Sequence, residues 1–240
     1  MKLGAYYQCF DNEKNVKAAL TSFRAWYPEA PIILASDGGK VDYSEFCRVI
    51  GAEYIWNRHI PGKHLLSLCY EADGMCTFFR QLLCGIALLG DKGCTHVVLL
   101  EDDVRTLKRQ TLVPTHALSG CNRNVRQHPG LLQCLFLKNG QWPVVQHYGG
   151  CGGCIFSVCF FKQLEVERVC SVLRDVMRID TFDTSIIATD QAISFIVLYF
   201  GGSIVDNEEF GEVLPYYFPK VVYDVAENKI AFLHQWKRDY

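Results

Sequence analysis

The feature that most constrains the fold is the alternation of short apolar runs with amphipathic segments through residues 1–104. Four runs are apolar at nearly every position, which is typical of strands buried on both faces. They lie at 3–10, 31–39 (running into a turn), 52–56 and 95–100. Such strands, separated by helices, form a parallel sheet that helices cover. We therefore predict the α/β class, with a Rossmann-like, mostly parallel central sheet flanked by helices.

The segment 11–31 is typical of the helices that separate these strands. Its apolar face is formed by Val16, Ala19, Leu20, Phe23 and Trp26. These positions recur at the spacing of one helical face, and Pro28 should end the helix. Candidates to cap its start are Asp11, Asn12 and Asn15.

The remaining elements follow from the same patterns. Further helices are predicted at 43–51 (closing at Gly51), 64–90 (broken near Gly74), 158–178, and from Thr189 or Asp190 to Gly201. Further strands are predicted at 131–137, 152–158 and 229–236, the last of which runs into His234. The segment 105–130 has little periodicity, so we expect loops that shape an acceptor pocket. We predict one domain over 1–240, with a nucleotide-binding half at 1–104 and an acceptor-binding half at 105–240.

Composition excludes several classes of protein. The net charge is −2 and no basic stripe is evident, so nucleic acid is not an expected partner. The longest apolar runs, such as 195–200, fall far short of the ~20 residues of a membrane span, so no transmembrane segment is expected. The first residues turn polar too early for a secretory signal. We expect a cytoplasmic protein (host cytoplasm, if the chain is viral) whose twelve cysteines are reduced.

Two cysteines leave a further interpretation open. Cys151 and Cys154 have zinc-type spacing, with His147 upstream. A structural zinc site needs a second pair of ligands at similar spacing, and the sequence offers none. The alternative is a glycine-rich entrance to a strand, which we favour.

Three consecutive acidic residues, Glu101, Asp102 and Asp103, directly follow the apolar run at 95–100. Like charges this close raise one another's pKa unless a positive group lies among them. Carboxylates at the end of a strand suit a hard divalent cation such as Mg²⁺ or Mn²⁺. The carboxyl end of the strands is also where parallel sheets bind ligands. The alternative is a set of turn and capping residues on a solvated loop.

At this point the sequence resembles the nucleotide-diphospho-sugar glycosyltransferases of the GT-A fold, whose defining motif is an acidic DxD-type triplet after a buried strand. "LEDDV" at 100–104 is especially similar to the collagen and lipooligosaccharide galactosyltransferase families. "GGCGGCIFS" at 149–157, "TDQAIS" at 189–194 and "FLHQWK" at 232–237 resemble later motifs of the fold in the same order. The likeness spans most of the chain and suggests a small stand-alone enzyme, of a size that a virus could encode.

The resemblance implies a metal-dependent transfer of a sugar from a nucleotide-diphospho-sugar to a hydroxyl of a glycan or glycoprotein. A UDP-sugar is favoured as donor, and a GDP-sugar is the alternative. Asp103 and His234 would bind Mn²⁺ or Mg²⁺. Glu101 or Asp102 would hold the ribose or a metal-bound water; the commoner first residue of the motif is Asp rather than Glu.

Four more residues acquire donor-binding roles from the same resemblance. Gln8 and Asp37, at the first two strand ends, would meet the nucleobase and ribose. Arg80 and Lys237 would meet the phosphates. Three of these residues, and the histidine at 234, have a plainer interpretation: an Asp-Gly turn for Asp37, surface charge for Arg80 and Lys237, and a structural role for His234.

The acceptor hydroxyl must lose a proton as it attacks, and an inverting enzyme needs a carboxylate base beside it. Asp190 is our candidate, because a helix N-terminus favours its ionised form. An ordinary N-cap fits the sequence equally well, and Asp183 and Asp180 are further candidates. "LEDDV" favours inversion, whereas Asp190 with Gln191 also resembles a motif of retaining families. The sequence therefore leaves the stereochemistry open.

Two other functions remain as alternatives. A sugar-1-phosphate nucleotidyltransferase shares a related sheet but normally opens with a glycine-rich phosphate loop, and residues 5–15 contain no glycine. A non-catalytic nucleotide-sugar-binding module would keep the fold without turnover. Nucleotide-sugar hydrolysis, with and without Mn²⁺, distinguishes the enzyme from the module.

Overall fold

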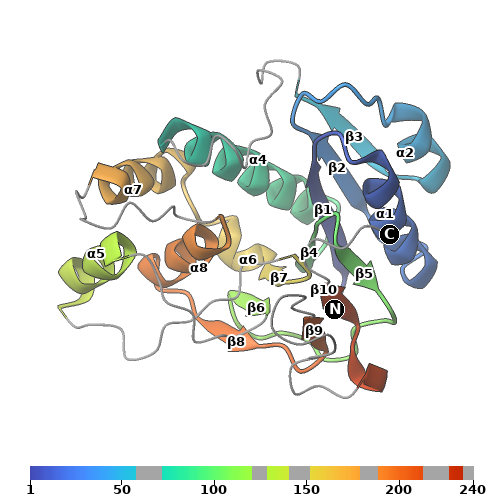
Figure 1. Cartoon of the computed structure of the whole chain (residues 1–240). Helices are drawn as coiled ribbons and strands as arrows, with labels where there is room; N and C mark the ends of the chain where they lie inside the picture. The colour runs from blue at the N-terminus through green and yellow to red at the C-terminus, as the bar shows by residue number, and fades with distance from the viewer. Residues whose placement is uncertain (58–71, 121–128, 141–151, 179–188, 213–226, 235–240) are drawn as a thin grey trace.

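The structure is a computed structural model, and it describes residues 1–57, 72–120, 129–140, 152–178, 189–212 and 227–234. The helices are α1 (Glu13–Trp26), α2 (Ser44–Ile50), α4 (Ala72–Asp91), α5 (Pro129–Asn139), α6 (Val158–Phe161), α7 (Val166–Arg178) and α8 (Thr189–Tyr199), with a short 3-10 helix at Glu227–Lys229. The strands are β1 (Leu3–Cys9), β2 (Ile32–Ser36), β3 (Glu53–Trp56), β4 (His96–Leu100), β5 (Val104–Thr106), β6 (Leu118–Gly120), β7 (Ile155–Ser157), β8 (Ile204–Asp206), β9 (Phe210–Glu212) and β10 (Phe232–His234). Figure 1 shows their arrangement.

The main sheet has seven strands in the order β3-β2-β1-β4-β7-β6-β8. Every neighbouring pair is parallel except the two pairs that involve β7. A second, three-stranded sheet has the order β5-β10-β9. The prediction of an α/β fold with a mostly parallel central sheet flanked by helices is thus confirmed. The division into functional halves at residue 104 stays a prediction.

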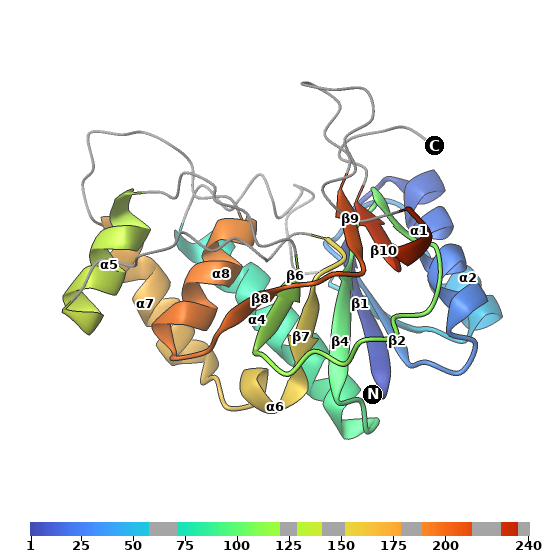
Figure 2. The ribbon, with the colours of Figure 1, turned by 90° about the horizontal axis from the view of Figure 1, so that it is seen from below.

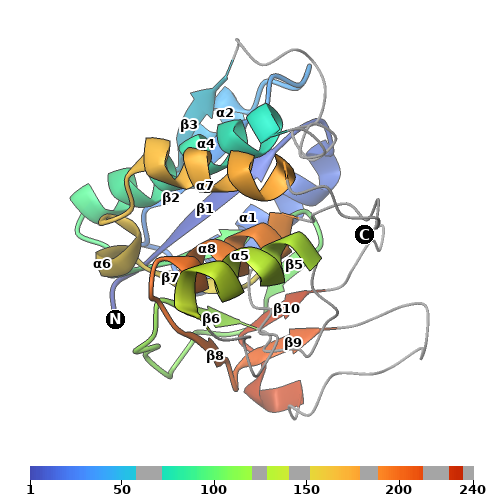
Figure 3. The same ribbon diagram turned by 90° about the vertical axis from the view of Figure 1, so that its left-hand side faces the viewer.

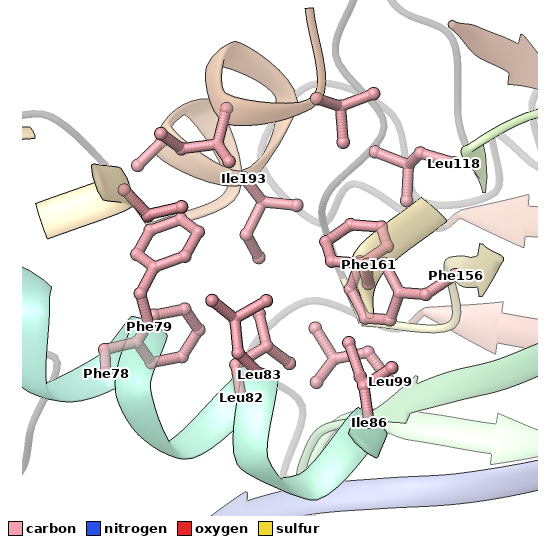
Figure 4. Packing of buried hydrophobic residues seen from close by; sticks show 14 of the residues in the cluster. Phe78, Phe79, Leu82, Leu83, Ile86, Leu99, Leu118, Phe156, Phe161 and Ile193 are labelled. Atoms are coloured by element: carbon pink, nitrogen blue, oxygen red, sulfur yellow. The ribbon is translucent and has the colours of Figure 1, made fainter. Parts of the chain in front are cut away.

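The two faces of the main sheet carry separate cores because successive side chains of a strand point to opposite faces. On one face, Ala5 and Leu34 pack with α1 and with residues of the small sheet. On the other face, Tyr6 and Ile33 pack with α4, and α7 and α8 extend this core. Figures 2 and 3 show α1 and α4 on opposite sides of the sheet. Figure 4 shows phenylalanine and leucine side chains of α4 facing Ile193 of α8 and Phe156 of β7.

The chain adds strands first on one side of β1 and then on the other. From β1 it passes through α1 to β2 and β3 on one side, and through α4 to β4 on the other. Helices α1 and α4 therefore leave the carboxyl ends of β1 and β4 open between them. Parallel sheets bind ligands in the crevice at such a switch point. The loops after Cys9 and after Leu100 meet there.

Several predicted elements prove to be wrong in type or extent. Residues 131–137, predicted as a strand, lie in helix α5, where Leu131 and Leu135 are buried one helical turn apart. A short apolar run fits either element, and packing against α7 and α8 decides for the helix. The segment 158–178 forms two helices, α6 and α7, rather than one. The segment 105–130 contains part of β5 and all of β6 rather than loops alone.

Two further differences concern single residues. Helix α4 begins at Ala72, two residues before Gly74, and residues 64–71 of the predicted helix lie outside the described residues, so the break near Gly74 stays a prediction. Trp26, predicted on the buried face of α1, is 42% exposed, whereas the rest of that face is buried. The next residue, Tyr27, fills that place, since its ring stacks on Phe23 at a centroid distance of 4.7 Å. Gly51 and Gly201 end their helices with positive φ angles, as predicted.

Helix α4 is the one described helix that is long and apolar enough to meet the length and composition criteria for a membrane span. Half of its most apolar window is buried inside the protein, however, against the sheet and α7. Core helices commonly meet the same criteria, so this is weak evidence for a membrane segment.

Candidate functional site

The acidic triplet occupies the turn between the two sheets. Strand β4 ends at Leu100 in the main sheet, and β5 begins at Val104 in the small sheet. The Val104 amide donates to the Glu101 carbonyl (3.1 Å) and closes the turn. Strand β10 pairs antiparallel with β5, and its register places His234 directly opposite Val104. The small sheet therefore brings a histidine from the end of the chain to the triplet.

Glu101, Asp103 and His234 form a compact group of potential metal ligands, with one ligand atom of each lying within 4.8 Å of the others. His234 Nε2 lies 3.2 Å from Asp103 Oδ1 and 3.7 Å from Glu101 Oε2. Asp103 and His234 are both buried. Two carboxylates and an imidazole suit Mn²⁺ or Mg²⁺ with further ligands from water or phosphate. The structure thus brings together the two predicted metal ligands and adds Glu101, for which the sequence suggested ribose or water.

Crowding of negative charge is evident at Glu101. Burial raises the pKa of its carboxyl group to about 8; the imidazole at 234 lowers that pKa, while the charges of Asp103, Asp190 and Asp102 raise it further. The side chain still exposes 41% of its surface, so solvent screens part of this effect. A bound divalent cation would relieve the same repulsion, because it favours the ionised carboxylate.

Asp102 points away from this group. The Nδ2 of Asn12, in the loop after β1, donates a hydrogen bond to Asp102 Oδ2 (2.8 Å). Asp102 and Asp103 occupy the turn that the Val104 amide closes, and the bond to Asn12 holds Asp102 apart from the group that Glu101 and Asp103 form with His234. The sequence identified Asn12 only as a possible helix cap.

Gln8 and Asp37 also meet at this edge, as the sequence predicted for two adjacent strand ends. Gln8 Nε2 donates to Asp37 Oδ1 (2.9 Å) and to Gln81 Oε1 of α4 (2.7 Å). Gln8 Oε1 accepts from the Tyr6 hydroxyl (3.1 Å). Burial and then the charge of Asp37 raise the pKa of Tyr6, so its phenol stays a donor. Sequence reasoning missed Gln81, because nothing local distinguishes it from any polar residue of a helix.

The glycine-rich approach to β7 packs directly against the triplet. A Cβ atom at Gly152 would lie 2.6 Å from Val104 Cγ2 and 2.8 Å from Glu101 Oε2. Gly153 has a φ of +89°, and its amide donates to the Leu99 carbonyl (2.7 Å). Glycine is required here because a larger residue would enter the metal-ligand group. Cys154 is buried, while Cys151 and His147 of the zinc alternative lie outside the described residues.

The remaining predicted residues differ in their surroundings. Asp190 lies in the first turn of α8, accepts from the Gln191 amide (2.8 Å), and its charge acts on Glu101. Arg80 faces α7, where it pairs with Glu167 (3.0 Å). Lys237, with the alternative bases Asp183 and Asp180, lies outside the described residues.

No protein-family model and no curated protein matches the sequence. Solved structures do match the fold over nearly the whole chain. The galactosyltransferase LgtC, in complex with donor and acceptor sugar analogues, is 14% identical with a TM-score of 0.56, covering 97% of this chain and 87% of that one. The chain has the GT-A fold. An active-site mutant of LgtC, with a glutamine replaced by glutamate, gives 15% identity and a TM-score of 0.54 over 98% of this chain and 88% of that one.

Mouse xyloside xylosyltransferase 1 in its apo form also matches, with 8% identity and a TM-score of 0.51 over 98% of this chain and 97% of that one. These glycosyltransferases share the α/β architecture with its mostly parallel sheet. In this GT-A fold the triplet after β4, His234 of β10 and the start of α8 all lie toward one edge of the sheet.

Proposed function

We propose that this protein is a divalent-metal-dependent glycosyltransferase that moves a sugar from a nucleotide-diphospho-sugar to a hydroxyl acceptor. The observation that carries the proposal is the convergence of Glu101, Asp103 and His234 at the switch point of the sheet. The likeness in fold to galactosyl- and xylosyltransferases supports the reaction class. It also argues against the nucleotidyltransferase alternative.

Mn²⁺ or Mg²⁺ would be held by the two carboxylates and the imidazole of this group. When bound, such an ion supplies Lewis-acid stabilisation to the diphosphate that leaves with the nucleotide. The residues fit the ion because they offer oxygen and imidazole ligands and because a cation would balance the charges of Asp103, Asp190 and Asp102 that act on Glu101. Arg80 and Lys237 remain proposed phosphate contacts; the former would have to leave its ion pair with Glu167.

The nucleoside would lie against the β1 and β2 ends. Asp37 and Asp102 supply carboxylate oxygens, which accept hydrogen bonds from ribose hydroxyls or a base N–H. Gln8 is held by three partners, so it contributes mainly by orienting Asp37. A UDP-sugar is the favoured donor, since its uracil offers an N–H, and a GDP-sugar meets the same requirement.

Asp190 is the proposed base for an inverting transfer. Its charge reaches the metal-ligand group, and the Gln191 amide fixes one of its oxygens. It would take the proton from the acceptor hydroxyl as that oxygen attacks the sugar. The acceptor is a glycan or glycoprotein. In a retaining reaction Asp190 and Gln191 would instead face the donor sugar; an active-site glutamine is also what one of the LgtC structures alters.

The test is calorimetry and thermal shift with Mn²⁺, Mg²⁺ and a chelator, followed by hydrolysis of a panel of UDP- and GDP-sugars. We expect Mn²⁺ at 100 times its Kd to stabilise the fold by about 2.7 kcal/mol, or roughly 5–10 °C in Tm. Asp103→Asn should abolish this shift. Asp91→Asn, which breaks an exposed ion pair with Lys162 at the far end of α4, is the matched control.

Two results would contradict the proposal. If neither metal nor nucleotide-sugar binds, the site has been misassigned. If both bind without any product, the protein is the non-catalytic module. Asp190→Asn separates these steps further, because donor binding should survive while transfer falls; equal transfer by the variant would exclude Asp190 as the base.

A further inference from the structure

Asn12 stands at the N-cap of α1, yet its side chain does not cap the helix. Asparagine is among the most favourable N-cap residues because its side-chain oxygen can accept from the first free helix amides. Here the carboxamide instead turns its Nδ2 to Asp102 Oδ2 at 2.8 Å. A local rule that is broken without gain to the helix is typical of a functional position.

The contact joins the two loops on either side of the switch point. Asn12 follows β1 and Asp102 follows β4, and the two residues are 90 positions apart in the sequence. Both side chains are accessible to solvent: Asn12 is exposed and Asp102 is half-buried. The bond is therefore not needed to satisfy a buried polar group. What it does is fix the direction of one carboxylate within a run of three.

Fixing that direction matters because the Asp102 side chain could otherwise turn toward His234. Its neighbours Glu101 and Asp103 already crowd His234, and a third carboxylate there would add to the repulsion. A donor group on the opposite side holds Asp102 toward β1 instead. Its remaining lone pairs can then accept from a ligand at the switch point, and ribose hydroxyls are donors that a nucleotide offers.

We infer that Asn12 is a positioning residue that holds Asp102 toward the ribose of the donor nucleotide. The inference rests on the proposed function, and it divides the triplet: Glu101 and Asp103 serve the metal, and Asp102 serves the nucleoside. Asn12 itself acts through Asp102.

Two substitutions test this. Asn12→Ala removes the donor without removing a cap bond, so the Tm without ligand should stay within about 1 °C of wild type. Asn12→Asp replaces the donor with a carboxylate that repels Asp102 but can turn to cap α1, so its Tm should be equal or higher. Both variants should bind UDP or GDP about three- to tenfold more weakly in the presence of Mn²⁺. Their affinity for Mn²⁺-pyrophosphate, which has no ribose, should not change.

Asn139→Asp is the control for net charge, because it makes the same charge change at the end of α5, far from α1 (Figure 1). It should leave both affinities unchanged. Wild-type nucleotide affinity in both Asn12 variants would overturn this inference without affecting the proposed function. So would a parallel loss of pyrophosphate affinity or a fall in Tm, because either indicates a metal or structural role. If wild-type protein binds no nucleotide at all, the proposed function fails first and the inference fails with it.

Discussion

Replacement of Gly152 by alanine tests whether the glycine-rich approach to β7 shapes the metal-ligand group. The added Cβ would lie 2.6 Å from Val104 Cγ2 and 2.8 Å from Glu101 Oε2, against about 3.4 Å or more for ordinary contact. The Glu101 carboxylate ends a flexible side chain and can move aside. Val104 is fully buried in β5, next to its cross-strand partner His234, and cannot move without disturbing that strand.

The cost follows from these contacts. Overpacking a well-packed site by one methyl costs about 1–3 kcal/mol, and Ala regains about 0.4–1 kcal/mol through the unfolded chain. The expected net loss is about 1–2 kcal/mol, which lowers the Tm by roughly 2–8 °C for a chain of this size. Displacement of Glu101 should also weaken Mn²⁺ binding, measured by calorimetry, about tenfold or more.

Gly202→Ala is the matched control. Its Cβ would lie 2.7 Å from Phe160 Cζ and 2.9 Å from Ala117 Cβ, neither of which belongs to the metal-ligand group. It should lose stability to a similar extent and keep wild-type Mn²⁺ affinity. If both variants show the same Mn²⁺ affinity, Gly152 does not shape the metal site, and if Gly152→Ala is as stable as wild type, the packing argument is wrong.

Two further predictions concern polar networks. Burial alone would raise the pKa of Glu209, but hydrogen bonds from the Leu112 amide and from the hydroxyl and amide of Thr111, with the charge of Lys108, hold that pKa below its usual range. The stabilisation from the ionised Glu209 is present above the unfolded pKa of about 4.3 and is lost as the pH falls through the lower folded value. Glu209→Gln should therefore lower the free energy of unfolding by about 2–3 kcal/mol at pH 7. In urea titrations the difference from wild type should shrink toward pH 3. Gln81→Met removes an acceptor of Gln8 and should weaken Mn²⁺-UDP binding about three- to tenfold, whereas Gln81→Glu keeps the acceptor and should bind more tightly than the Met variant. Equal affinities in the two Gln81 variants would exclude that contact from nucleotide binding.

Much of the fold could be predicted because its signals are local. Strands β1, β2 and β4 are apolar on both faces, and α1 carries its buried residues at helical spacing. The errors arose where local patterns fit two structures. Residues 131–137 suit a buried strand as well as the helix that they form, and contact with α7 and α8 makes the difference. Trp26 lies one position before Tyr27, whose ring takes its expected place against Phe23.

The site was predictable in part for the same reason. A polar side chain at the end of a buried strand is visible in the sequence, so Asp103, Asp37 and Gln8 could be placed at one edge. Their partners could not be predicted. The contacts of Gln8 with Gln81 and of Asp102 with Asn12 link residues 73 and 90 positions apart, and no local pattern specifies such pairs.

The sequence by itself determined that β1, β2 and β4 are buried and parallel and that acidic residues follow β4, because side-chain periodicity and strand-end chemistry are local properties. It did not distinguish β3, which lies at the exposed edge of the sheet. Only the tertiary structure decided which residues of the triplet lie beside His234 and which one lies beside Asn12. The register of β10 against β5 sets His234 beside Glu101 and Asp103, and the crossing of the chain at β1 sets Asn12 beside Asp102. Both depend on how distant segments pack, which is a property of the whole fold.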